Sequence, residues 1–362
     1  MNHLNNFESY INEALGIADA TIFYQDLISF NVISNILSFI DSNPEVNAKE
    51  KNEIVIPYTS IRRFVTDWSI YKYFPVSEIV VYLTMTKKSS DYLSSFKYGK
   101  SEKEQVPFKL GGSALPFAVG REKQATRVVD PIKKLTDHSL SIHLELDFLF
   151  SDNFIKNRHE KKLETKIESV LLHELNHLYE YYCRKFKGSG KISLSTTYAA
   201  IGPNRGRRPK NIWEYWQFYF TDLIYQSEPH EVRAYVQEAK AYVDKLDFKT
   251  FKKTNIWESA KMMQTFDYKN FIEKINKVIY KHNPAYVDVM IDRLIKDFIR
   301  DYELNLKELK EDPIISLDTL RDMSRDQFFE FWQKKINKAG DTIVRKMIRL
   351  YSLKKEEGED II

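Results

Sequence analysis

The sequence contains few of the residues that small secreted or hairpin-rich proteins depend on. Its single cysteine, Cys183, cannot form an internal disulfide, so nothing in the chain requires an oxidising compartment, and no cysteine pair is present for zinc or redox chemistry. Gly and Pro number 11 each in 362 residues, roughly 3% apiece against a usual ~7% and ~5%. Tight hairpins are therefore few, and we expect long helices rather than an all-β sandwich.

Long apolar runs and a strong excess of one charge are also absent. The longest apolar stretches, such as 79–83, are far shorter than the ~18 residues that span a bilayer. The polar, acidic opening MNHLNNFESYINEALG does not have the pattern of a signal peptide. A net charge of +4 is too small to imply a polyanionic partner. We expect a cytoplasmic protein that does not bind membranes.

The hydrophobic pattern predicts an α+β fold. Apolar residues recur with a helical period in the first 40 residues, and the segments 54–57, 78–86 and 140–150 have the β-branched and apolar content of strands. In the last of these, Ile142, Leu144, Leu146, Phe148 and Phe150 alternate with other residues, as in a strand with one buried face. The stretches 87–105 and 110–121 are polar or contain Gly, and we expect them to be connections.

A helical period of apolar residues begins at about residue 151 and predicts that the rest of the chain consists mainly of helices. Lys162–Phe186 forms one long helix, a second helix ends near Gln226, and another begins at Pro229. Everything after about residue 250 is expected to be helical, and Ser324 with Gln327 forms a capping-box signature. We therefore predict an N-terminal helical region, a mixed core and a C-terminal helical domain, with the bounds 1–52, 53–250 and 251–362.

The long helix contains the pattern HExxH, formed by His173, Glu174 and His177 with two residues between the second and the third. Positions i and i+4 of a helix lie on nearly the same face about 6 Å apart along the axis, so two imidazoles can hold one metal ion. Glu174 lies one step around the helix, where a carboxylate can reach a water molecule held by that ion without being a ligand. The pattern therefore predicts a metal centre with Glu174 as general base.

A catalytic zinc site usually has three protein ligands, so a third must come from another segment. The extended form HExxHxxGxxH would need Gly and His where this chain has Glu180 and Cys183. A carboxylate from a later helix is the other common solution, and residues 227–235 supply Glu228 and Glu231. Glu228 is better suited to cap the helix that begins at Pro229, where its carboxylate would meet free N–H groups and the positive end of the helix dipole. His230 could coordinate the ion or line the cleft, and Glu180 could support a ligand or face solvent.

These residues resemble the HExxH zincin metallopeptidases of the gluzincin type, in which a glutamate on a downstream helix is followed three residues later by a small residue. Glu231 and Ala234 match that spacing. The resemblance covers about residues 140–245 and implies that His173, His177 and Glu231 bind Zn²⁺. It also implies a zincin-like core, which consists of a small mixed or antiparallel sheet and the HExxH helix. In such a core, the strand at 141–150 would be the edge strand beside an extended peptide substrate.

The function implied is a zinc-dependent metallopeptidase that cleaves peptide bonds with a metal-activated water. The donor for the oxyanion remains open among several residues, which are Tyr198, Tyr215, Tyr225, His230, Arg233 and Tyr235. Two imidazoles and a carboxylate also suit cobalt, nickel or iron.

Two other functions are compatible with the sequence. In the first, the metal stabilises a catalytically silent assembly protein whose C-terminal helices bind a protein partner. The opening NFESYINE is similar to that of uncharacterised tailed-phage proteins, which would place the chain in a bacterial host cytoplasm or a virion. In the second, the basic residues of 205–210 with Trp213 and Trp216 bind nucleic acid. We favour this least because short basic loops are usually solvated and the Trp spacing is helical.

Overall fold

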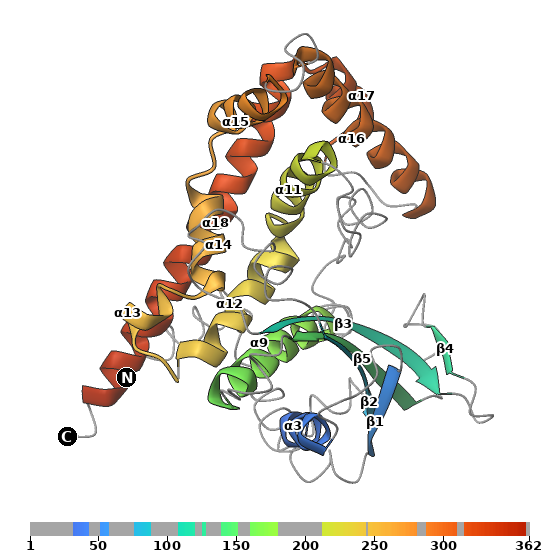
Figure 1. Cartoon of the computed structure of the whole chain (residues 1–362), viewed down its shortest axis with the longest axis vertical. Coiled ribbons are helices and arrows are strands. Elements are labelled where there is room, and N and C mark those ends of the chain that lie inside the picture. The colour runs from blue at the N-terminus through green and yellow to red at the C-terminus, as the bar shows by residue number, and fades with distance from the viewer. Residues whose placement is uncertain are drawn as a thin grey trace, which may run out of the picture. The chain divides into compact units, whose positions relative to one another are not determined.

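The structure is a computed structural model, and its cartoon is drawn in Figure 1. It describes residues 32–42, 51–57, 76–87, 108–119, 125–127, 139–150, 160–179, 212–243, 245–280, 287–309 and 315–359. The chain divides into two compact units, one formed by 1–190 with 237–245 and the other by 191–236 with 246–362. The domain boundaries at 52 and 250 remain predictions.

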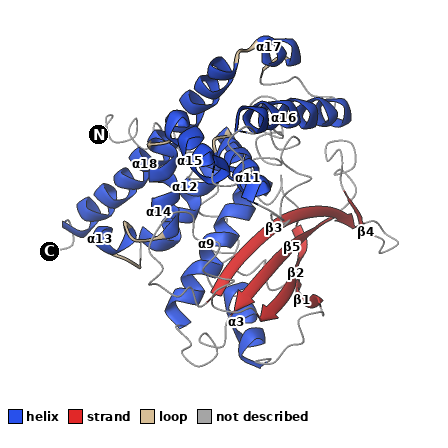
Figure 2. Cartoon of the chain, turned by 45° about the horizontal axis from the view of Figure 1, so that its top comes forward, coloured by secondary structure: helices blue, strands red, loops and turns tan. Residues whose placement is uncertain are grey.

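The first unit is built on a five-stranded mixed sheet, drawn as red arrows in Figure 2. The strand order is β1 (Lys51–Pro57), β2 (Val76–Lys87), β5 (Ser139–Phe150), β3 (Phe108–Val119) and β4 (Ala125–Arg127). β2 and β5 are parallel, and the other neighbouring strands are antiparallel.

β5 confirms the strand predicted from alternation. Leu144, Leu146, Phe148 and Phe150 are buried, whereas the residues between them are exposed or half-buried. Its predicted place at the edge of the sheet is wrong, because β5 is hydrogen-bonded to β2 on one side and to β3 on the other. Alternation reports only which face of a strand is buried, and it carries no information about the strand's neighbours.

β3 contradicts the expectation that residues 110–121 form a connection. The strand contains Gly111, Gly112 and Pro116, which are all depleted in strands. It forms nevertheless because it pairs with β5 along its whole length, from Phe108 opposite Phe150 to Val119 opposite Ser139. Among the described strands, only β4 pairs with the outer side of β3, over its last three residues. Proline is tolerated in strands with such a free edge.

Helix α9 (Glu160–Tyr179) packs along β3 and also contacts α3 (Ile33–Ser42). Its core side consists of Leu163, Ile167 and Leu171, which are at most 5% exposed and recur with the helical period. The predicted helix is thus confirmed over the residues that carry HExxH, and its predicted end at Phe186 lies outside the described residues. Pro229–Val243 forms α12, and the last turns of this helix belong to the first unit.

The second unit is helical. It contains α11 (Ile212–Gln226), the first turns of α12, α13 (Phe248–Phe251), α14 (Asn255–Gln264), α15 (Tyr268–Tyr280), α16 (Val287–Leu309), α17 (Leu317–Asp322) and α18 (Arg325–Glu359). The predicted end near Gln226 and start at Pro229 are confirmed. The capping box before α18 is also formed: the Ser324 N–H donates to Gln327 Oε1 at 2.8 Å, and the Gln327 N–H donates to Ser324 Oγ at 3.4 Å.

α18 packs on α14, α11, α15 and α16, and its red ribbon runs alongside α13 and α14 in Figure 1. Aromatic side chains fill the space around Phe220, whose ring centroid lies 5.3–6.2 Å from four others, those of Phe266, Phe271, Phe328 and Phe329. Gly340 lets α18 approach α14 closely, because a β-carbon there would overlap the backbone of Met263 and Gln264. This unit is therefore held by apolar packing.

The described residues together are mostly helical with one small mixed sheet, which is an α+β fold. None of the helices described is both long enough and apolar enough to cross a membrane.

Candidate metal centre

The two histidines of the HExxH pattern lie one turn apart on α9. Their ring centroids are 4.9 Å apart and the ring planes meet at 82°, so one ring presents its edge to the other. Both side chains are half-buried, next to the buried Leu171 and Leu172. The apolar residues that hold α9 in the core therefore fix the direction in which the imidazoles project.

The carboxylate of the predicted third ligand, Glu231, lies in the first turn of α12. The helix begins at Pro229, whose fixed φ suits a first helical position. Glu231 is only 1% exposed. A buried carboxylate is costly unless hydrogen bonds, an opposite charge or a metal compensates it. Its burial is consistent with the role of a ligand.

His173, His177 and Glu231 form a group that could bind a metal ion. Each offers one ligand atom, and these atoms all lie within 4.8 Å of one another. The ligand atoms of a tetrahedral zinc site, with bonds of ~2.1 Å, lie about 3.4 Å apart. The limit of 4.8 Å exceeds that spacing by about 1.4 Å, and imidazole and carboxylate are ligand types of zinc, so the residues present fit Zn²⁺.

Glu228, the alternative third ligand, is not part of this group. Its side chain is fully buried, and Oε1 accepts a hydrogen bond from Lys335 Nζ of α18 at 2.8 Å. Its backbone carbonyl accepts the first hydrogen bond of α12, from the Val232 N–H at 2.9 Å. Glu228 therefore begins the helix through its backbone, whereas its carboxylate binds a lysine.

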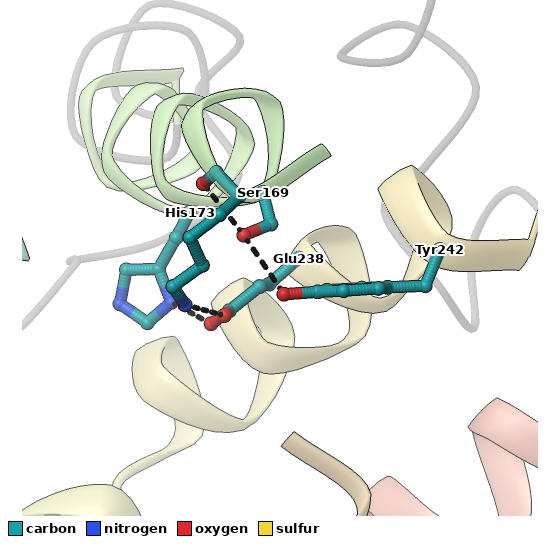
Figure 3. A network of polar contacts seen from close by, with 5 residues as sticks. Ser169, His173, Glu238 and Tyr242 are labelled. Carbon is teal, nitrogen blue, oxygen red and sulfur yellow. Dashed lines mark hydrogen bonds and ion pairs between the residues drawn. The ribbon is translucent and has the colours of Figure 1, made fainter. Parts of the chain in front are cut away.

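Glu238, a residue that the sequence analysis missed, supports the first histidine. Its Oε2 lies 3.4 Å from His173 Nδ1, and Oε1 accepts a hydrogen bond from Lys166 Nζ at 3.1 Å (Figure 3). Histidines that bind metals commonly donate their other N–H to a carboxylate, which fixes the tautomer and the ring orientation. With its proton on Nδ1, His173 would offer Nε2 to an ion.

Charge compensation keeps Glu238 ionised. Burial alone would raise the pKa of Glu238, but the opposite charge of Lys166 and the contact with His173 lower it to about 2. Burial would likewise lower the pKa of Lys166, whereas Glu238, followed by Tyr242, raises it above its ordinary range. The network thus presents a permanently charged acceptor to His173 at neutral pH.

Further polar contacts join the last turns of α12 to α9. Ser169 Oγ and Tyr242 Oη are 3.4 Å apart, and these two side chains point toward each other in Figure 3. Lys245, just beyond the helix, donates to Glu168 Oε2 at 2.6 Å. These contacts hold the last turns of α12 against α9 within the first unit.

His230 lies beside the third ligand. Its Nε2 is 3.5 Å from Glu231 Oε1, and its ring meets that of Tyr225 edge to face at a centroid distance of 5.9 Å. This distance places the imidazole of His230 beside the carboxylate of Glu231. His230 is not part of the group of possible metal ligands among the described residues, and its role in lining a cleft remains a prediction.

Glu174, the predicted general base, is half-buried on α9. Several other predicted residues lie outside the part of the chain that the structure describes. Glu180, Cys183, Tyr198 and the basic residues of 205–210 lie outside the described residues, as do the side chains of Trp213 and Tyr215. One sequence signal could have identified Glu238: it lies seven residues after Glu231, and two helical turns return a side chain to the same face.

No protein-family model, curated protein or solved structure matches this chain. The candidate metal centre therefore depends on the geometry of α9 and α12.

Proposed function

We propose that this protein is a zinc-dependent metallopeptidase with a zincin-like core. The observation that carries the proposal is the convergence of His173, His177 and Glu231, whose ligand atoms lie within 4.8 Å although the third comes from a separate helix. Two imidazoles, a carboxylate and an open fourth position are the ligand set of hydrolytic zinc sites. The contact between Glu238 and His173 supports the proposal, because metal ligands commonly have such a partner.

A zinc ion held by His173, His177 and Glu231 would supply a Lewis acid for the peptide carbonyl and would lower the pKa of a water molecule. Glu174 removes the proton from the attacking water and later delivers it to the nitrogen of the leaving amine. Its position one residue after His173 suits this role, because the carboxylate projects about 100° around the helix from that ligand. His230, next to Glu231, is the candidate to donate a hydrogen bond to the developing oxyanion.

The outer edge of β3 is the proposed binding site for the peptide. No described strand pairs with this side of Phe108–Pro116, and α9 packs along the same strand. An extended substrate can add to a free strand edge through main-chain hydrogen bonds, which tolerate many side chains. β3 thus takes the role that the sequence analysis gave to the strand at 141–150.

The variant Glu174→Gln tests the proposal. The purified full-length protein should contain about one zinc per chain by elemental analysis, and the variant should retain it. Cleavage of a broad peptide library should fall by about 10²–10⁴ in the variant, the usual contribution of a general base. Glu164→Gln is the matched control, because Glu164 is a 46% exposed residue on the same helix, and its cleavage rate should remain unchanged.

Three results would contradict the proposal. Absence of zinc from the wild-type protein would remove the metal centre altogether. Undiminished cleavage by Glu174→Gln would exclude this residue as the base. A protein that holds zinc but cleaves no peptide would be a metal-stabilised scaffold, such as an assembly protein.

A further inference from the structure

We propose that Lys335 of α18 is a positioning residue for Glu231, so that the C-terminal helices contribute to metal affinity without contacting the ion. This inference rests on the proposed metal centre and assigns a role to a region outside the HExxH resemblance. It is carried by the ion pair between Lys335 and Glu228, the residue directly before α12.

The first step concerns how firmly Lys335 is held. Its Nζ lies 2.8 Å from Glu228 Oε1 and 5.3 Å from the centre of the Trp332 ring. Trp332 is fully buried one turn earlier in α18, next to the ring of Phe298 at 5.4 Å. The lysine is thus fixed by a packed aromatic side chain, and only 22% of its side chain is exposed.

The second step concerns the connection from Glu228 to the ligand. The Glu228 carbonyl accepts the hydrogen bond from the Val232 N–H that opens the first turn of α12. Glu231 lies within that turn, three residues after Glu228. A displacement of Glu228 would therefore move the backbone that carries the ligand.

The third step concerns the free-energy cost of burying Glu228. Glu228 is fully buried, and no described residue forms a hydrogen bond with its Oε2. A buried ion pair is often no more stable than apolar residues of the same volume, and an unsatisfied buried oxygen adds a further penalty. The ion pair between Lys335 and Glu228 therefore contributes little to stability, and we infer that its role is to fix the position of the first turn of α12.

The experiment measures Zn²⁺ affinity by competition with a chromophoric chelator, and Co²⁺ absorption as a signature of ligand geometry, on the full chain. Lys335→Met should weaken Zn²⁺ binding about tenfold, the lower end of the effect of outer-shell partners, and change the Co²⁺ spectrum. Lys335→Arg, which keeps the cation, should restore both to within about threefold of the wild type.

The double variant Lys335→Met/Glu228→Gln separates positioning from stability. It no longer buries an uncompensated charge, so its Tm should recover to near that of the wild type, while its weakened Zn²⁺ binding should persist. Ile343→Ala, at a fully buried residue two turns further along α18, is the control: it should lower Tm and leave Zn²⁺ affinity unchanged.

The outcomes distinguish this inference from the proposed function. A wild-type protein that binds no Zn²⁺ would overturn both. Three other results would overturn only the role of Lys335. In the first, Lys335→Met binds Zn²⁺ as tightly as the wild type. In the second and third, the double variant regains its Zn²⁺ affinity together with its Tm, or Ile343→Ala loses as much affinity as Lys335→Met.

Discussion

Two buried clusters in this protein are built from different chemistry. Around Glu238, on α9 and the end of α12, the contacts are ionic and directional. Around Phe220, in the helical unit, they are contacts between aromatic rings at many relative orientations. Apolar packing tolerates changes that preserve volume, whereas a polar network fails when one partner is removed. The first cluster therefore specifies a geometry, and the second supplies stability.

The largest loss of stability is expected from Phe220→Ala. Truncation of a fully buried Phe leaves a cavity and should lower the free energy of unfolding by about 4 kcal/mol, within the range of roughly 3–5 kcal/mol for such changes. Phe220→Leu, which keeps more of the volume, should cost less than half as much. Denaturant unfolding measures both, and equal losses would contradict the view that volume decides stability here.

A slightly smaller loss is expected from Lys166→Met. Removal of the lysine leaves Glu238 buried without its cation, which should lower the free energy of unfolding by about 3 kcal/mol. This value is the lower end of the usual range, because 30% of the Lys166 side chain is exposed. The double variant Lys166→Met/Glu238→Leu should regain most of this loss but bind Zn²⁺ about 10–100-fold more weakly, because His173 loses its carboxylate. Recovery of both properties would show that the network only balances charge.

Zinc should stabilise the wild-type protein by about 2.7 kcal/mol at a free concentration 100 times its Kd. His177→Ala should abolish most of this increase, because the metal would retain only two protein ligands. Calorimetry with and without the metal measures the shift in Tm. An equal shift in the variant would show that zinc binds elsewhere.

The smallest effect is expected at the exposed start of α13. Asp247 accepts hydrogen bonds from the Thr250 N–H at 2.9 Å and the Thr250 hydroxyl at 2.7 Å, and these bonds lower the pKa of its carboxyl. Since the folded pKa lies below the unfolded value, the contribution is complete above the ordinary pKa of an aspartate and is lost as the pH falls below it. Asp247→Ala should thus reduce Tm slightly at pH 7, and the reduction should shrink as the pH is lowered below the ordinary pKa of an aspartate.

The sequence predicted those features whose cause is local. The helical period around Leu171 predicted α9, and the four-residue spacing of His173 and His177 predicted that their rings converge. Pro229 predicted the start of α12 because its effect on φ needs no tertiary partner. The spacing of Glu231 and Ala234, through the zincin resemblance, pointed to Glu231 rather than Glu228, and Glu231 is the acid that lies in one group with the two histidines.

The features that were missed depend on partners distant in sequence. β3 contains Gly112 and Pro116, which disfavour a strand locally, and it forms through pairing with β5. Glu238 gains its role from Lys166 and His173 on another helix. Its spacing of seven residues from Glu231 indicates that the two acids share a helix face, but it does not indicate a buried ion pair. Local propensity cannot reveal contacts that only the tertiary fold creates.

The order of the proposed ligands along the chain has a consequence for biosynthesis. His173 and His177 leave the ribosome first, and the acid on α12 follows only after roughly 50 further residues have been added. A nascent chain that ends between α9 and α12 offers a divalent ion two imidazoles and no carboxylate from α12. If the proposed ligand set is right, all three side chains become available to one ion only after α12, with Glu231, has left the ribosome.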